Sequence, residues 1–148
     1  MANARSTMYN FLMEGTGSGS TLTYAKVVDI KNTPQLQGSA EALDVTTLSN
    51  WARVYIPGIE ETQSQLSMTA NYTLADFSSV KALEGSLRHW AIWFGGTRSG
   101  STVTPTGSAG KFTFDGFLHA HVPEKGVNEV QEMQLDIIPA TEIVFSAS

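Results

Sequence analysis

The sequence predicts a mostly β protein, an antiparallel β-sandwich or barrel with one flanking α-helix. Several segments alternate apolar and polar residues with a period of two, most cleanly Gln65–Thr73, as half-buried strands do. Clusters of Pro, Gly, Asn and Asp separate these segments, which is typical of turns. Only Asp76–Glu84 has apolar residues at helical spacing. Many short strands and one helix indicate this class of fold.

The composition is that of a single domain stabilised by packing and sheet hydrogen bonds. The chain has 148 residues, enough for one sizeable core, and no cysteine, which excludes disulfides and thiolate metal sites. Charged residues make up 16% of the chain, below the roughly 25% of typical soluble domains. A surface with so little charge is easily buried against copies of itself, although a small lectin would look similar.

Charge and hydropathy exclude two classes of partner. The formal net charge is −5, and no run of Lys or Arg supplies the basic stripe of a nucleic-acid-binding domain. The sequence contains no apolar run of the roughly 18–20 residues that a membrane-spanning helix needs. Residues 1–14 lack the basic-then-apolar order of a secretory signal. We therefore expect the protein to be made and kept in a cytoplasm.

The first 20 residues are predicted to form a flexible N-terminal arm, and residues 21–148 a single β-sandwich domain. The arm ends in Gly15–Ser20, a Gly/Ser stretch that is typical of linkers. This stretch does not suit a phosphate-binding loop, because it lacks the Lys-Ser/Thr ending and no strand is predicted before it.

Two strands and a long loop are predicted between the arm and the helix. Apolar and polar residues alternate from Leu22 to Ile30, and a Pro/Gly turn follows. A second extended run then opens a long polar loop from about Thr46 to Gln63. The next strand directs four apolar residues to one face: Leu66, Met68, Ala70 and Tyr72.

The predicted helix, Asp76–Glu84, has start and stop signals. Asp76 is the expected N-cap, because its carboxylate can accept the free amide protons of the first turn. Gly85 is the expected end of the helix. Phe77, Val80 and Leu83 lie on one face and are expected to pack on the sheet.

The rest of the chain is predicted to form further strands. Leu87–Phe94 is apolar on both faces, which predicts a central strand or one covered by a helix or another subunit, and Gly95–Gly110 has the composition of a solvated loop. Lys111–Val122 alternates again, with Gly116 as a bulge. The turn residues Pro123–Gly126 predict that the following strand pairs back as a hairpin. The last two strands are expected at Asn128–Ile138 and Glu142–Phe145.

No constellation of reactive residues predicts an enzyme. His119 and His121 share one face of a strand with a spacing that suits zinc, but the sequence places no third ligand beside them. No Gly-x-Ser-x-Gly elbow adjoins a strand and a helix. Two carboxylate pairs lie in or near a polar loop, where solvated charge is the simpler interpretation: Glu41 with Asp44, and Glu60 with Glu61. We expect no catalysis, no metal and no cofactor.

A series of unreactive motifs follows in a specific order. Glu41 and Leu43–Ser49 are followed by Arg53, Tyr55–Gly58, the helix that begins near Asp76, and finally Phe114–Gly116. In this order the motifs resemble those of the major tail tube proteins of long, non-contractile-tailed bacteriophages. The resemblance covers the chain from about Leu22 to Phe145 and does not include the N-terminal arm.

The resemblance implies a structural virion protein. Such proteins have a β-sandwich-like barrel with a flanking helix, and they assemble into rings, typically hexameric, that stack into the tail tube. The tube is the conduit for DNA ejection into the host, and the DNA passes without specific binding. The implied partners are further copies of the chain and the tape measure, tail terminator and distal tail proteins. The implied location is the phage tail, assembled in the host cytoplasm.

Two sets of residues are candidates for roles in such a tube. Trp51, Arg53, Tyr55 and Ile59 lie in the long polar loop and are expected to contribute to ring stacking, as an arm that docks on the next ring. Glu132 and Asp136 lie on the polar face of a predicted strand and are expected to make the lumen acidic. DNA carries one negative charge per roughly 1.7 Å of its axis, so an acidic wall lets it slide where a basic wall would bind it.

Two other functions remain open from the sequence. The first is the inner tube of a contractile tail or of a type VI-like secretion machine, which shares the architecture. The second is a carbohydrate- or surface-binding β-sandwich module, which the aromatic residues Trp90 and Trp93 suggest. Rings or tubes at high concentration would favour a tube protein, and a stable monomer that binds glycans would favour the binding module.

Overall fold

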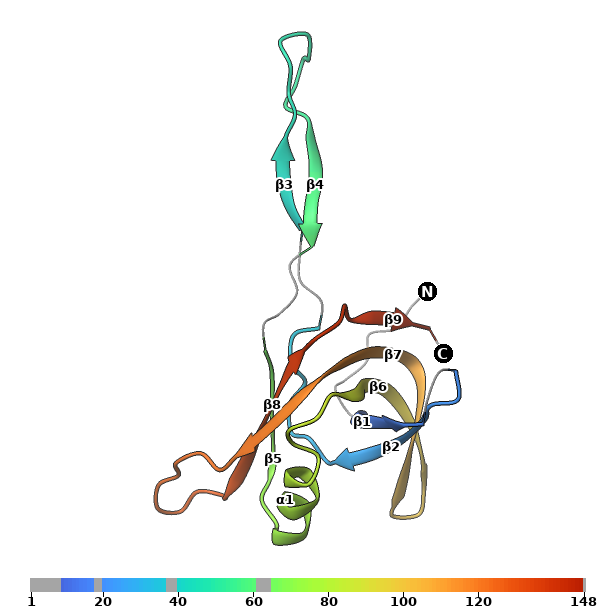
Figure 1. The fold of residues 1–148 in the computed structure, drawn as a ribbon, viewed down its shortest axis with the longest axis vertical. Coiled ribbons are helices and arrows are strands. Elements are labelled where there is room, and N and C mark those ends of the chain that lie inside the picture. Colours follow the sequence, from blue (N-terminus) through green and yellow to red (C-terminus); the bar gives the residue numbers. More distant parts are fainter. Residues whose placement is uncertain (1–8, 18–19, 37–39, 61–64, 148) are drawn as a thin grey trace.

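A computed structural model describes residues 9–17, 20–36, 40–60 and 65–147. These form nine strands and one helix (Figure 1). The elements are β1 (Asn10–Thr16), β2 (Thr23–Val28), β3 (Ala40–Asp44), β4 (Tyr55–Glu60), β5 (Leu66–Asn71), α1 (Leu74–Lys81), β6 (Arg88–Ser99), β7 (Thr102–His121), β8 (Glu132–Pro139) and β9 (Val144–Ser146). The mostly β class with one helix is therefore confirmed.

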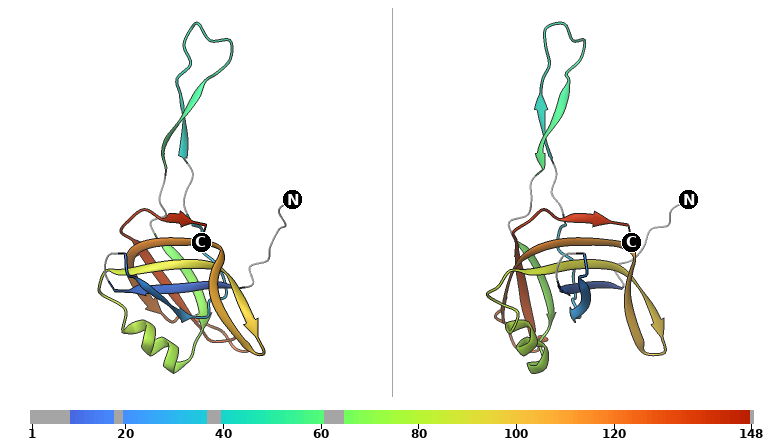
Figure 2. Two further views of the ribbon diagram at one scale, coloured as in Figure 1. Left: turned by 90° about the vertical axis from the view of Figure 1, so that its right-hand side faces the viewer. Right: turned by 45° about the vertical axis from the view of Figure 1, so that its right-hand side comes forward.

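Seven strands form one antiparallel sheet that makes up the body of the molecule. Their order is β2-β1-β6-β7-β8-β5, and β9 pairs with β7. The sheet curls strongly, so that its first and last strands approach each other (Figure 2). Ile30, just after β2, forms a bridge with Ala70 of β5, and the Lys31 amide donates to the Thr69 carbonyl at 2.7 Å. The curled sheet is thus partly closed by its own chain, which protects the β5 edge.

The core fills the inside of the curled sheet. Every strand of the body except β9 contributes a buried apolar side chain to it, and α1 covers it with Val80. In β5 and β8 the predicted alternation is confirmed, because Met68 and Leu135 are opposite each other and fully buried. Trp90 of β6 is also fully buried, and its Nε1 donates to the Gly116 carbonyl at 3.1 Å. The prediction of a central strand here is confirmed, since β6 lies between β1 and β7.

The N-terminal segment is not a flexible arm where the structure describes it. Asn10–Thr16 forms β1, which pairs with β2 on one side and β6 on the other. Leu12 faces the main core, whereas Phe11 and Met13 form a second cluster with Ala91 on the opposite face. A strand buried on both faces carries apolar residues at consecutive positions, so the period-two signal is absent from it. Residues 1–8 and 18–19 of the expected arm lie outside the described residues.

The helix begins earlier than predicted. Thr73 is the N-cap, and its hydroxyl accepts from the Asp76 amide at 3.2 Å. Asp76 instead lies in the first turn, where its negative charge stabilises the positive end of the helix dipole. The helix ends at Lys81, with Gly85 a few residues beyond it in a left-handed conformation (φ +88°). With eight residues, α1 is too short to cross a membrane, and the described part of the chain contains no other helix.

The segment Gly95–Gly110 is strand rather than solvated loop. Beyond a bulge between Phe94 and Gly96, β6 and β7 continue as a paired ribbon that turns at Gly100 and projects from the body (Figures 1 and 2). The expected bulge at Gly116 is not found, because the register of β7 is regular there. Gly116 is instead a point of close approach, where an added Cβ would lie 2.6 Å from the Ile138 carbonyl oxygen.

The β7–β8 hairpin is confirmed, with a later start for the second strand. The turn residues after β7 connect it to β8, which pairs antiparallel with it from Gly116↔Pro139 to His121↔Gln134. The last strand, β9, is short, and lies against Lys111–Thr113 of β7.

The predicted long loop is also structured. Strands β3 and β4 pair with each other in a separate two-stranded sheet and form a hairpin that stands clear of the body (Figure 1). Its polar, Thr- and Ser-rich sequence gives no apolar periodicity, so pattern alone indicates a loop. The expected extension of this loop over residues 61–63 lies outside the described residues.

Candidate assembly surfaces

The β3–β4 hairpin has no core of its own. All five residues of β3 are exposed, and so are Tyr55 and Ile56 of β4. Backbone pairing from Ala40↔Glu60 to Asp44↔Tyr55 holds the two strands together. Because a two-stranded hairpin without an apolar core is marginal in water, other contacts have to order its tip.

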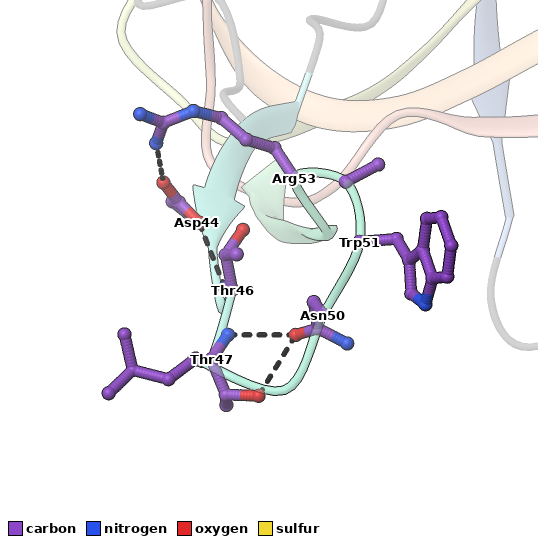
Figure 3. A pocket seen from close by; sticks show the side chains of 8 residues that line it. Asp44, Thr46, Thr47, Asn50, Trp51 and Arg53 are labelled. Carbon is purple, nitrogen blue, oxygen red and sulfur yellow. Dashed lines mark hydrogen bonds and ion pairs between the residues drawn. The ribbon is translucent and has the colours of Figure 1, made fainter.

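A network of polar side chains orders the base of the tip (Figure 3). Asp44 accepts from the Thr46 amide at 2.9 Å and from Arg53 Nη1 at 2.8 Å. The Thr46 hydroxyl accepts in turn from the Val54 amide at 2.8 Å. These contacts join the two strands just where their regular pairing ends. The hydroxyl and amide hydrogen bonds from Thr46, and then Arg53, lower the pKa of the Asp44 carboxyl.

A second group of hydrogen bonds closes the outer turn. The Asn50 side-chain oxygen accepts from the Thr47 amide at 2.7 Å and from the Thr47 hydroxyl at 3.0 Å, and the Asn50 amide donates to the Thr47 carbonyl at 3.0 Å. Asn and Thr side chains commonly replace backbone partners in this way. The tip is therefore ordered by its own hydrogen bonds, and it stands clear of the body (Figure 1).

The ordered tip displays apolar side chains that nothing covers. At the tip, Leu48 and Trp51 have relative exposures of 108% and 105%, and nearer the base of the hairpin Ile59 of β4 has 91%. In Figure 3 the Trp51 ring points away from the hydrogen-bonded turn. Single exposed apolar residues are ordinary, but here they are gathered on one projecting element. Exposed aromatic side chains on a rigid element are suited to anchor a protein–protein contact.

The four expected stacking residues divide into two kinds. Trp51 and Ile59 are nearly or fully exposed, and Tyr55 is about half exposed at 53%. Arg53 contributes to the internal order of the tip through its ion pair with Asp44. Sequence reasoning did not single out Leu48 or the Thr47–Asn50 hydrogen bonds. The spacing Thr-x-x-Asn was the signal for the latter, because a three-residue separation suits a side chain that closes a turn.

Glu132 and Asp136 share the outward face of β8, as their spacing predicts, but both have partners within the chain. Glu132 forms ion pairs with Lys125 and Lys31, and hydrogen bonds from these two lysines lower its pKa to about 2. Asp136 has only 6% exposure and accepts from Ser67 Oγ at 2.8 Å and Gln134 Nε2 at 3.0 Å. Their assignment to a tube lumen stays a prediction.

The histidines and tryptophans of the body are engaged in other contacts. His119 and His121 lie with their ring centroids 5.9 Å apart, but His119 faces Glu84 and His121 faces Asp136. Among the described residues, no group of three or more His, Asp or Glu side chains is placed to hold a metal ion. Trp90 is buried in the core, and Lys111 Nζ lies 4.2 Å from the Trp93 ring centroid. The sugar-binding platform that the Trp90–Trp93 pair suggested is therefore not formed by Trp90.

Comparisons with known proteins identify the fold but no family. No protein-family model matches the chain, and no curated protein sequence does. Over 99% of its length the chain is similar to a chain in the six-fold symmetrised cryo-EM structure of the anti-feeding prophage baseplate, of which 97% is covered. The TM-score is 0.61 and the sequence identity is 9%. At this identity the likeness demonstrates a shared fold.

Proposed function

We propose that this protein is a structural component of a phage tail that assembles into stacked rings and forms the tail tube, the conduit for DNA ejection. In this proposal the β3–β4 hairpin is the arm that docks on the next ring. The observation that carries the proposal is the hairpin itself, which is ordered by its own hydrogen bonds while Leu48 and Trp51 are completely exposed. The fold shared with a chain of a phage-tail-related baseplate supports it.

The hairpin contact would be heterologous, which suits a tube. The hairpin projects from one end of the body, and α1 lies toward the other end (Figure 1). A projecting arm that docks on a different surface of the next copy leaves that copy's own arm free. Such contacts repeat without closing along the axis and build an open assembly. Burying Trp51 and Leu48 in the contact would add about 25 cal/mol for each Å² of apolar surface removed from water.

The first test is whether the purified protein assembles. We expect size-exclusion chromatography to show rings or larger species as concentration rises, and negative-stain electron microscopy to show tubes. Trp51→Ala is expected to leave the fold and the rings intact and to shorten the tubes. Ala52→Ser is the matched control, because Ala52 is the exposed neighbour of Trp51 and presents little apolar surface. A wild-type protein that stays monomeric at every concentration would contradict the proposal.

A second candidate function is the inner tube of a contractile tail or type VI-like secretion machine. The likeness to an anti-feeding prophage baseplate chain favours this candidate over a carbohydrate-binding module, because it links the fold to a tail-like assembly. The two tubes differ in their partners, since the inner tube of a contractile machine binds a sheath. Co-sedimentation of assembled tubes with a sheath protein distinguishes them: binding along the tube would favour the contractile machine.

The lumen role of β8 is a further part of the proposal. Within one copy, two lysines already pair with the Glu132 carboxylate, and Asp136 is only 6% exposed. In the proposed tube, tape measure, terminator and distal tail proteins would contact the ends or the interior. Replacing both Glu132 and Asp136 by Lys is expected to leave some tubes assembled and to impair DNA delivery, measured as infectivity. Normal delivery by such tubes would remove both residues from the lumen.

A further inference from the structure

A buried carboxylate in β1 lacks a hydrogen-bond donor. Glu14 is only 9% exposed, and its Oε1 lies 3.7 Å from Arg88 Nη1, which is long for a direct hydrogen bond. Its Oε2 is buried and has no hydrogen-bond partner among the described residues. A buried charged oxygen without a donor is costly, so native proteins almost always supply one. Glu14 Oε2 therefore needs a cationic or amide donor that the described residues do not supply.

The space beside Glu14 can admit such a donor. A hollow of about 290 Å³ lies between β1, β2 and α1, and β2 is the first strand of the sheet, with an unpaired edge. The hollow is lined by Glu14, Thr16, Ala25, Lys26, Val27, Ser79 and Leu83. Lys26 is the cation among the lining residues, but its ammonium group pairs with Asp29 at 2.8 Å. The hollow thus places the Glu14 carboxyl beside an open edge of the sheet.

Two described cations, Arg98 and Lys111, have no carboxylate partner within the described chain, and Arg98 lies in the projecting ribbon. Arg98 lies near the tip of the β6–β7 ribbon, is exposed, and donates from Nε to the Gly100 carbonyl at 2.8 Å. Its terminal nitrogens make no ion pair within the described part of the chain. The other described cations are engaged, Lys111 with the Trp93 ring and the rest with carboxylates: Lys26, Lys31, Arg53, Lys81, Arg88 and Lys125.

Glu14 Oε2, which has no hydrogen-bond donor, and Arg98 lie at opposite ends of the same pair of strands. Glu14 is opposite Trp90 near the start of β6, whereas Asn10 is opposite Phe94, and Arg98 lies farther along β6 in the projecting ribbon. A chain cannot bring these two ends of its own sheet together. Two copies placed side by side can, because the ribbon of one copy then reaches the β1–β2 end of the next.

We propose that Arg98 of one copy inserts into the hollow of a neighbouring copy and donates to Glu14 Oε2. This contact rests on the proposed function, since its occupant is a second copy of the chain. It is heterologous, and repeated with a closing rotation it makes a ring. The hairpin would then connect rings, and the Arg98–Glu14 pair would connect neighbours within a ring. The planar guanidinium suits this recess because it can serve both carboxylate oxygens at once.

Variants at Arg98 test the pair without touching the core. Arg98→Gln is expected to leave the monomer's unfolding temperature unchanged and to weaken association between copies by about thirtyfold or more, measured by analytical ultracentrifugation. Thr97→Gln, the adjacent exposed position, is the matched control and is expected to associate as wild type. Adding Arg98→Gln to a Glu14→Gln variant should cause little further loss, because the two residues act as one pair. Independent, additive losses would overturn the pairing.

Cross-linking tests the geometry directly, because the chain contains no native cysteine. Thr16→Cys lines the hollow and Ser99→Cys lies beside Arg98. We expect a disulfide-linked dimer when the two single variants are mixed and oxidised, and none from either variant alone or from Ser99→Cys mixed with Glu129→Cys. Tubes that form without this cross-link, and that tolerate Arg98→Gln, would overturn the Arg98–Glu14 contact and leave the proposed function standing. A protein that never self-associates would overturn both.

Discussion

The body and the β3–β4 hairpin are both antiparallel sheets, yet different forces hold them. In the body, paired strands bury apolar side chains, and Met68, Met133 and Leu135 are fully inaccessible. In the hairpin all five residues of β3 are exposed, and polar side chains such as Asp44 and Asn50 supply the order. The body is thus stabilised by burial, and the hairpin by local hydrogen bonds.

This difference shows which apolar residues are free to bind. An apolar side chain in the body already contributes to folding, so its removal lowers stability. An apolar side chain at the hairpin tip contributes almost nothing to the monomer, and its free energy of burial remains available for a partner. The order of the tip reduces the entropy that such a contact would lose. The predictions below test this division of roles.

The largest expected effect separates two tryptophans. Trp90→Ala would leave a large cavity in the core and remove the hydrogen bond to the Gly116 carbonyl. We expect it to lower the free energy of unfolding by about 3–5 kcal/mol, measured by urea denaturation. Trp51→Ala, at the exposed tip, is expected to change that free energy by about 0.5 kcal/mol or less. Similar losses from the two variants would mean that the hairpin contributes to the core after all.

Two glycines make the same comparison at smaller scale. An alanine Cβ at Gly116 would lie 2.6 Å from the Ile138 carbonyl oxygen, inside a sheet that cannot move easily. We expect Gly116→Ala to lower the free energy of unfolding by about 1–3 kcal/mol. At Gly58 the nearest atom would be the Glu41 carbonyl oxygen at 3.2 Å, in a ribbon with free space around it. Gly58→Ala is expected to change global stability by about 0.5 kcal/mol or less. Denaturation curves of both variants provide the check. A larger loss of stability from Gly58→Ala than from Gly116→Ala would contradict the expectation that the body tolerates an added methyl group less well than the hairpin does.

The same division explains what the sequence could predict. Strands with one buried face, such as β5 and β8, leave a period-two pattern, and the sequence identified both. The pattern is lost where a strand is buried on both faces, as in β1, or on neither face, as in β3 and β4. The polar ribbon of β6 and β7 was missed for the second reason. Periodicity reports a difference between faces, so it cannot detect strands whose two faces are alike.

The candidate sites could be predicted in part. The sequence singled out Trp51, Tyr55 and Ile59 as apolar residues in a polar segment, and the structure shows them exposed. It could not show that Arg53 pairs with Asp44, because the pairing depends on the hairpin register. Nor could it identify Glu14, since a single acidic residue next to a Gly/Ser stretch resembles any solvated charge. Burial and the absence of a donor are properties of the folded chain alone.

A local effect is expected when the outer turn of the hairpin loses its closing side chain. Asn50→Ala removes the acceptor of the Thr47 amide and hydroxyl. One hydrogen bond contributes about 1 kcal/mol, so we expect amide exchange at Thr47 to become roughly fivefold faster. The unfolding temperature should not change, because the body does not depend on the tip. Hydrogen exchange followed by NMR measures the rate at each amide. Faster exchange throughout the paired strands β5 and β8 would mean that the body does depend on the hairpin tip.

The smallest effect concerns two carboxyls with lowered pKa values, one in each region. Lys125 and Lys31 lower the pKa of Glu132 in the body to about 2, against about 4.3 in an unfolded chain. Its ionised form therefore stabilises the fold above about pH 4.3, and this contribution is lost as the pH falls toward 2. We expect Glu132→Gln to lower the urea midpoint at neutral pH, and the difference from wild type to disappear through that window.

The hairpin carboxyl has the same sign but a local consequence. Hydrogen bonds from Thr46, and then Arg53, lower the pKa of Asp44, so its ionised form orders the tip until acid protonates it. Asp44→Asn is therefore expected to change the amide resonances of the tip and to leave the urea midpoint at neutral pH unaltered. Glu124→Gln, an exposed carboxyl outside the described ion pairs, is the control for both variants. If acid loosened the tip and the body together at one pH, the hairpin could not be the independently ordered arm of the proposed assembly.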